Sequence, residues 1–268
     1  GACHCEACQS AFREWLKEKY GTLDNLNRAW WGRFWSHEYT EWEQIHSPAD
    51  RGETTVTALE LDWRRFVTEQ FCSFCEMEIS AVKKHSDLPA TTNYMDIFKN
   101  INYNRLARGL DIISWDNYPF WHREKDEVPT AVTAAFNHSM MRSMKKQPFL
   151  LMESAPSVIN WRENNPVKRP GMHMLSSMQA LAHGSDSVQY FQWRKGRGSY
   201  EKFHGAVLDH KDGSNTRVFR EVPEVGRRLP GLEHLLDGTV NRPDAAVLFD
   251  WENWWAVEDI TGPRLDLD

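Results

Sequence analysis

The sequence predicts an α/β protein built as part of a (β/α)8 TIM barrel, and three observations carry that prediction. From residue 90 onward, short apolar runs alternate with segments of helical periodicity, which indicates a parallel sheet with helical crossovers. Polar residues follow each apolar run, as expected at the carboxyl ends of barrel strands. No glycine-rich phosphate loop follows any of these runs, which argues against a doubly wound sheet.

The segment before residue 90 is predicted to be helical, with one polar loop. Ser10 can cap a first helix that Gly21 ends. A second, Trp-rich helix with its following loop is expected over residues 23–35, and a polar loop over residues 41–55. One apolar face then marks a long helix over residues 59–82.

Four strand–helix units are predicted after that, roughly half of a barrel. The strands are expected at residues 90–95, 111–116, 149–153 and 187–193. Their helices are expected around residues 103–107, 132–144, 174–181 and 218–229.

The predicted domain organisation has one boundary. Residues 1–240 are assigned to a partial catalytic barrel, and residues 241–268 to the start of a second α/β domain. Asp244–Asp250, after a proline, is predicted as the first strand of that domain. Because the chain starts without Met and stops soon after this strand, we expect a fragment of a longer protein. The sequence does not assign a location, although a cytoplasmic one is favoured.

Composition excludes two classes of partner. A net charge of −6 and a pI near 6.0 offer no basic surface, so no nucleic-acid partner is expected. No apolar stretch approaches the roughly 20 residues of a membrane span, so no membrane association is expected.

The 13 tryptophans favour a carbohydrate ligand, because flat indole rings stack on sugar faces, although core packing explains many of them.

Glu153 is the main candidate for a catalytic residue. It ends the apolar run 148–152, where burying a carboxylate is costly unless something local compensates. Glycosidases that retain configuration use two carboxylates about 5–5.5 Å apart, one attacking the sugar and one donating a proton. Glu153 fits the attacking group, with a general base or a structural carboxylate as alternatives. Asp116, at the end of another predicted strand, is a possible partner.

Three further side chains have the chemistry to bind a sugar. Glu201 and His204 are three residues apart, so on a helical turn they share a face and can hold two hydroxyl groups. The alternative is a solvent-exposed ion pair. Trp161, in the Asn-rich loop after Glu153, is either a stacking platform or a packed anchor of that loop.

The spacing of Cys3, Cys5 and Cys8 predicts a structural zinc site. Thiolates on such a tight loop can converge on one ion at about 2.3 Å each, whereas neighbours this close are poorly placed for a disulfide. The fourth ligand is either His4 or an upstream cysteine, and the upstream cysteine is favoured. Cys72 and Cys75, on the long predicted helix, are interpreted as core residues rather than ligands.

Together these segments resemble glycoside hydrolase family 42, the β-galactosidases. The matching runs are Cys3–Cys8, Ser114–Pro119, Phe149–Glu153, Asn164–Gly171, Phe191–Arg194 and Glu201–His204. The resemblance implies a (β/α)8 TIM barrel, of which this chain is the C-terminal portion, followed by the first strand of a smaller α/β trimerisation domain. It also implies retaining hydrolysis of terminal β-D-galactosyl groups. It implies small β-galactosides and oligosaccharides as substrates, and a homotrimer for the full-length protein.

The resemblance also assigns roles to individual residues. By motif, Glu153 corresponds to the nucleophile and Cys3, Cys5 and Cys8 to three of four zinc-binding cysteines. The corresponding galactose-binding positions are Tyr118, Trp161, Glu201 and His204. The family's acid/base glutamate precedes the cysteine cluster, outside this chain, so the chain alone is expected to be inactive.

Two alternative functions remain open on the sequence. The first keeps the mechanism and changes the sugar to an α-L-arabinopyranoside, which has the galactose ring stereochemistry without the hydroxymethyl group. The second is a non-catalytic, zinc-stapled carbohydrate-binding module in which the carboxylates are structural.

Overall fold

The computed structural model describes residues 3–48, 56–121, 126–211, 213–236 and 243–259. These belong to two compact units, one of residues 1–86, 99–109 and 246–268 and one of residues 87–98 and 110–245. The predicted boundary after residue 240 stays a prediction. Among the described helices, none has both the length and the apolar character needed to cross a membrane.

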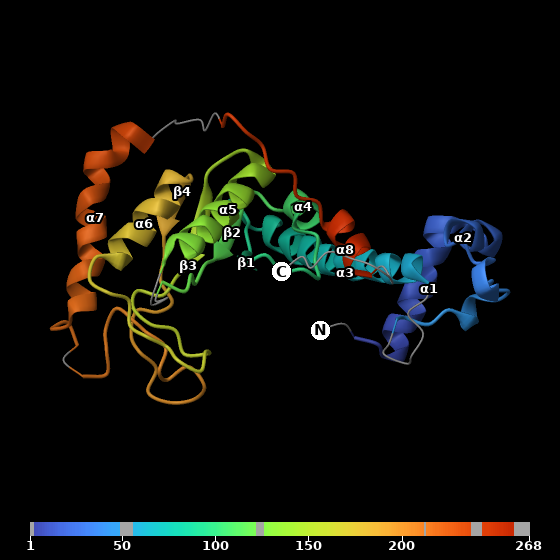
Figure 1. The fold of residues 1–268 in the computed structure, drawn as a ribbon, viewed down its shortest axis with the longest axis horizontal. Helices are drawn as coiled ribbons and strands as arrows, with labels where there is room; N and C mark the ends of the chain where they lie inside the picture. Colours follow the sequence, from blue (N-terminus) through green and yellow to red (C-terminus); the bar gives the residue numbers. More distant parts are fainter. Residues whose placement is uncertain (1–2, 49–55, 122–125, 212, 237–242, 260–268) are drawn as a thin grey trace. The chain divides into compact units, whose positions relative to one another are not determined.

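The first unit is helical throughout its described part (Figure 1). Its elements are α1 (Glu6–Tyr20), α2 (Leu23–Ala29), η1 (Phe34–Ser36), η2 (Trp42–Gln44), α3 (Thr57–Lys83), α4 (Tyr103–Leu106), η3 (Ala107–Gly109) and α8 (Trp251–Asp259). α1 begins earlier than predicted, with Cys5 rather than Ser10 at the N-cap. It ends as predicted at Gly21, whose φ of 72° suits a residue without a Cβ atom.

An aromatic core holds the first helices together. Phe12, Trp63 and Phe66 are buried against one another, with ring centroids 5.0 to 5.3 Å apart. Leu16 and Leu26 complete the same buried cluster. As predicted from their apolar spacing, α1 and α3 each bury one face.

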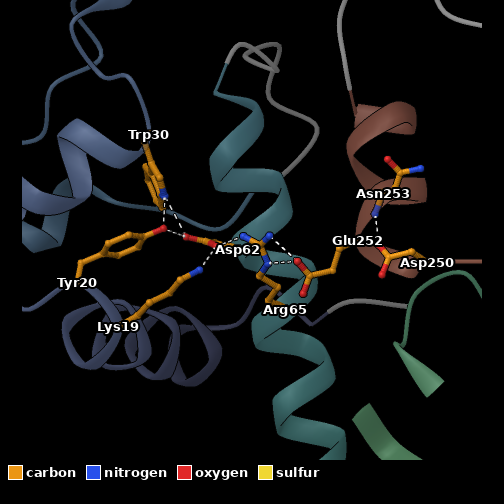
Figure 2. A network of polar contacts seen from close by, with 8 residues as sticks. All are labelled: Lys19, Tyr20, Trp30, Asp62, Arg65, Asp250, Glu252 and Asn253. Atoms are coloured by element: carbon orange, nitrogen blue, oxygen red, sulfur yellow. Dashed lines mark hydrogen bonds and ion pairs between the residues drawn. The ribbon is translucent and has the colours of Figure 1, made fainter. Parts of the chain in front are cut away.

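A buried carboxylate, Asp62 on α3, links three of these helices (Figure 2). It accepts hydrogen bonds from Tyr20 Oη at 2.6 Å and Trp30 Nε1 at 3.0 Å, and it pairs with Lys19 and Arg65. Burial opposes ionisation, but the hydrogen bonds from Lys19, Tyr20 and Trp30 outweigh it and hold the pKa of Asp62 below its usual value. The carboxylate therefore stays charged and fully paired.

The second unit contains a four-stranded parallel sheet in the order β1-β2-β3-β4. The strands are β1 (Asn93–Met95), β2 (Ser114–Asp116), β3 (Phe149–Glu153) and β4 (Ser185–Val188), and the helices are α5 (Val128–Lys145), α6 (Met172–Ala182) and α7 (Arg217–Leu236). The predicted parallel α/β architecture is confirmed, and β3 has the predicted limits. β4 begins two residues earlier and ends five residues earlier than the predicted range 187–193, and its register with β3 shifts between Phe149 and Leu150.

The predicted strand over Asp244–Asp250 is not formed. The described segment pairs with no strand in the described part of the chain, and its Leu248 is 96% exposed. Apolar composition alone suggested a strand here, but a strand also needs a neighbour for its backbone N–H and C=O groups. Helix α8 follows directly and buries Trp251 and Trp255.

We predict that Asp62→Ala lowers the free energy of unfolding by about 3–5 kcal/mol, because Lys19, Tyr20 and Trp30 lose their shared acceptor. Urea unfolding followed by circular dichroism at pH 7 measures this. Glu14→Ala, which removes an exposed partner of Lys17, is the control and should stay within about 0.5 kcal/mol. A loss below about 1 kcal/mol for Asp62→Ala would show that the network adds little.

Candidate active site

The carboxyl ends of three neighbouring strands lie at one edge of the sheet. The parallel register pairs Asp116 of β2 with Glu153 of β3, and the backbone N–H of Asn117 donates to Glu153 O at 2.9 Å. From β1, Asn93 Nδ2 donates to Asp116 Oδ2 at 2.6 Å. The carboxyl ends of β1, β2 and β3 therefore meet at this edge of the sheet.

Tyr118 fixes the orientation of the Glu153 carboxylate. Its hydroxyl donates to Glu153 Oε2 at 2.6 Å, a short bond of the kind formed with a charged acceptor. Burial raises the pKa of Tyr118, and the hydrogen bond to Glu153 raises it further. The phenol therefore keeps its proton and remains a donor. The second oxygen of Glu153 has no partner among the described residues.

Asp116 is a second, different carboxyl beside Glu153. Burial raises the pKa of Asp116 to about 6; the charge of Glu153 adds to this and the hydrogen bond from Asn93 opposes it. Its Oδ1 atom is buried without a hydrogen-bond partner among the described residues. Near neutral pH this group can hold a proton, unlike an ordinary aspartate.

Aromatic and imidazole rings form one wall next to Glu153. Tyr118 contacts Trp161 edge-to-face at 4.9 Å, and Trp161 lies 5.3 Å from the fully buried His204. His204 Nδ1 lies 3.0 Å from Gly205 O, while its Nε2 is buried without a partner among the described residues. Phe191 also contacts the His204 ring edge-to-face, with ring centroids 5.0 Å apart.

Glu201 and His204 lie on a turn rather than on a helix. The backbone N–H of His204 donates to Glu201 O at 2.9 Å, which closes the turn. The i,i+3 spacing still brings both side chains to the same cavity, although Glu201 itself is exposed. The shared face was predicted correctly, and only the type of backbone differs.

Two loops below the sheet in Figure 1 carry these residues, and they are tied together. Gly205 N donates to Val158 O at 2.7 Å, and Asn160 Nδ2 donates to Tyr200 O at 2.7 Å. A Cβ atom on Gly205 would lie only 2.3 Å from Ser157 Oγ, so glycine permits this close approach. The Trp161 loop and the His204 turn thus form one structure.

Lys168 fastens the base of the Trp161 loop. Its buried ammonium group donates to Ala155 O at 2.6 Å, and its backbone N–H donates to Ser157 O at 2.9 Å. Arg217 of α7 donates to Lys168 O at 2.6 Å. Burial lowers the pKa of Lys168 to about 8. A single lysine in a polar loop gives no sequence signal for such a role.

A single cavity of about 710 Å³ joins these features. Its lining contains six candidate residues from the sequence, namely Asp116, Tyr118, Glu153, Trp161, Glu201 and His204. It also contains residues that the sequence did not indicate, among them Asp96, Phe120, Thr133, Asn137, Arg162 and Phe191. Two of these, Thr133 and Asn137, lie four residues apart on one face of α5, where polar helix positions look like ordinary solvent-facing ones.

The cysteine cluster lies in the helical unit, at the start of α1. The Sγ atoms of Cys3, Cys5 and Cys8 all lie within 4.8 Å of one another, and those of Cys5 and Cys8 are 3.7 Å apart. A hydrogen bond from the Cys8 backbone lowers the pKa of Cys5 to about 7. The His4 ring is engaged elsewhere, with Nδ1 2.8 Å from Ser47 Oγ and its face stacked on Trp63.

Cys72 and Cys75 lie on α3, as predicted. Cys72 is buried, and burial raises its thiol pKa to about 11. Cys75 is half-buried, and the pKa of its thiol is also raised by burial. Neither belongs to a cluster of metal-binding groups among the described residues.

Known proteins resemble the chain over nearly all of its length. β-Galactosidase BglY of Alicyclobacillus acidocaldarius is 58% identical over 98% of the chain, and β-galactosidase GalA of Bacillus licheniformis is 51% identical over 98%. The chain spans 38% and 40% of their lengths, respectively.

Solved structures give the same result. The cold-adapted β-galactosidase of Rahnella sp. R3 matches with a TM-score of 0.94 and 53% identity, over 98% of this chain and 39% of that one. Gan42B, a GH42 β-galactosidase from G. stearothermophilus, matches with a TM-score of 0.93 and 52% identity, over 98% and 40%. These matches confirm the predicted fold class, a portion of a TIM barrel. A family model described as Beta-galactosidase matches residues 1–232. The chain therefore belongs to glycoside hydrolase family 42.

Proposed function

We propose that this chain supplies the nucleophile and the sugar-binding groups of a retaining β-galactosidase. The observation that supports this most directly is the hydrogen bond from Tyr118 to Glu153 inside a cavity that also contains His204 and Trp161. A carboxylate held in one orientation, next to rings and hydroxyl-binding groups, suits attack on a sugar carbon.

The proposed chemistry is a double displacement. In the first step, the unpaired oxygen of Glu153 forms a bond to the anomeric carbon, and the bond from that carbon to the leaving oxygen breaks. A second carboxylic acid donates a proton to the leaving oxygen. We assign that donor to the glutamate that precedes the cysteine cluster in the family. In the second step, water attacks the same carbon, gives its proton to that group and releases Glu153.

The cavity wall is suited to the galactosyl ring. Trp161 offers an indole face, Glu201 offers acceptors, and the free Nε2 of His204 can exchange a hydrogen bond with a hydroxyl group. Because Tyr118 stays protonated, its hydroxyl can remain a hydrogen-bond donor to Glu153 throughout the reaction without losing its proton. These groups bind the sugar, whereas Glu153 is the group that attacks it.

We further propose a structural zinc ion bound by Cys3, Cys5 and Cys8. Ligands at about 2.3 Å in a tetrahedron are about 3.8 Å apart, close to the Cys5–Cys8 separation of 3.7 Å. In the metal-free chain, hydrogen bonding with Cys3 and burial raise the pKa of the Cys8 thiol to about 12. A bound cation would displace the proton of this thiol. Since His4 is turned to Ser47, we assign the fourth ligand to a residue outside the chain.

On the resemblance alone, we extend the proposal to a homotrimer of the full-length protein. α-L-Arabinopyranosides remain an alternative substrate class, because the cavity groups named above do not depend on a hydroxymethyl group. Relative kcat/KM values on the two aryl glycosides separate these substrates.

Glu153→Gln in a protein of the relatives' full length should lower kcat on an aryl β-galactoside by at least about a thousandfold, because the amide cannot attack the anomeric carbon. Binding of galactose, measured by calorimetry, should persist. Asp186→Asn, at an exposed position, is the control. Unchanged turnover by Glu153→Gln would favour the non-catalytic binding module instead.

Cys5→Ser should reduce the zinc content of the purified protein from about one ion per chain to a small fraction, because a hydroxyl is a far weaker zinc ligand than a thiolate. Mass spectrometry of the metal content measures this. Cys75→Ser, on α3 and outside the cluster, should leave the zinc content unchanged. Equal zinc content in both variants would contradict the proposed site.

A further inference from the structure

A local irregularity in the sheet brings Asp116 beside Glu153. The register pairs Trp115 of β2 with Leu151 of β3 and then shifts, so that Asp116 pairs with Glu153 and Met152 is passed over. Paired residues on neighbouring strands are about 5 Å apart and extend their side chains to the same face of the sheet. Both carboxyl groups line the cavity. The irregularity therefore places a second carboxyl group next to the proposed nucleophile.

The carboxyl group of Asp116 is buried without a cationic partner. The residue is 7% exposed, its Oδ2 accepts only from Asn93 Nδ2, and its Oδ1 is buried without a partner among the described residues. The buried Asp62 is different, because it pairs with Lys19 and Arg65. A carboxylate that served structure alone would be expected to have such partners, since an uncompensated buried charge is costly.

The charge that acts on Asp116 is that of Glu153 on β3. Tyr118, in the segment after β2, donates to Glu153 and stays protonated because burial raises its pKa. From β1, Asn93 contributes an uncharged amide. From α5, His138 packs against the residue before Asp116, and burial lowers the pKa of this imidazole to about 3, which keeps it neutral. The other titratable or charged side chains of the cavity lining are Asp96, Arg162, Glu201 and His204.

A second negative charge beside Glu153 favours the first displacement. During the attack, positive charge develops on the sugar ring and the charge of Glu153 is consumed in the new bond. An ionised Asp116 stabilises that positive charge. Its repulsion of the Glu153 carboxylate also disappears as the bond forms, which lowers the barrier further. A protonated Asp116 has neither effect.

We propose that Asp116 is a positioning residue that acts through Glu153: its ionised form promotes the attack on the anomeric carbon, and its protonation slows that attack in acid. The inference rests on the proposed glycosidase function and adds the control of that function by pH. Burial and the charge of Glu153 raise the pKa of Asp116 to about 6, although the hydrogen bond from Asn93 opposes the rise. The carboxyl group is therefore mostly ionised above that pH and takes up a proton below it.

The test measures kcat/KM on nitrophenyl β-D-galactoside from about pH 5 to about pH 8, in a protein of the relatives' full length, because kcat/KM reports groups of the free enzyme. Asp116→Asn keeps the size of the side chain and removes its charge. Asn93→Ala removes the hydrogen bond that holds the pKa of Asp116 down. Asp186→Asn makes the same carboxylate-to-amide change at an exposed position and is the matched control.

We expect kcat/KM of the wild-type protein to fall about tenfold between about pH 7.5 and about pH 5, with a midpoint near the pKa of Asp116. Asp116→Asn should lose this fall, with a rate at about pH 7.5 that is already about tenfold below wild type. Asn93→Ala should shift the midpoint in the opposite sense, to higher pH by about half a unit or more. The control should keep the wild-type midpoint.

A wild-type midpoint in Asp116→Asn would overturn the inference. If that variant does not fold, an unchanged midpoint in Asn93→Ala would overturn it instead, since Asn93 lies at an exposed position and its loss leaves both carboxyl groups in place. Wild-type protein that is inactive at every pH would remove the proposed function, so the two failures are distinct.

Discussion

The side-by-side ending of β2 and β3 is the constraint on which the candidate site depends. Parallel pairing places Asp116 directly beside Glu153, so two carboxyl groups share one edge of the sheet. They cannot both be ionised cheaply in a buried position, and the two receive different partners: Asn93 for Asp116 and Tyr118 for Glu153. Tyr118 thereby orients the Glu153 carboxylate, whereas burial raises the pKa of Asp116 to about 6, although the hydrogen bond from Asn93 opposes that rise.

The loop that bears Trp161 depends on the buried ammonium group of Lys168. Burial lowers the pKa of Lys168 to about 8, although the nearby Glu221 opposes that shift. Such burial opposes stability, since the charged form loses its hydration. In return, the bonds to Ala155 and Ser157 fix the segment directly after Glu153 and close the loop that bears Trp161.

Periodicity predicted the elements of the sheet unit because burial of one face leaves a regular pattern in the sequence. It located β3 to the residue, and the charge that ends this strand marked the site at Glu153. It failed at Asp244–Asp250, where apolar residues are exposed and no strand is available as a neighbour in the described chain. It also missed Asn137, since an asparagine within a helix looks the same in sequence whether it faces solvent or a cavity.

The unpaired atoms of the cavity indicate what kind of ligand it accepts. Asp116 Oδ1, Asn137 Oδ1 and His204 Nε2 are all buried without partners among the described residues. Each costs about 1–3 kcal/mol while it stays unsatisfied, and an apolar ligand would leave that cost in place. A ligand with many hydroxyl groups removes it, because a hydroxyl can donate to either carbonyl-type oxygen and can donate to or accept from the imidazole. These unpaired atoms support the sugar ligand proposed above rather than an aromatic ligand of similar size.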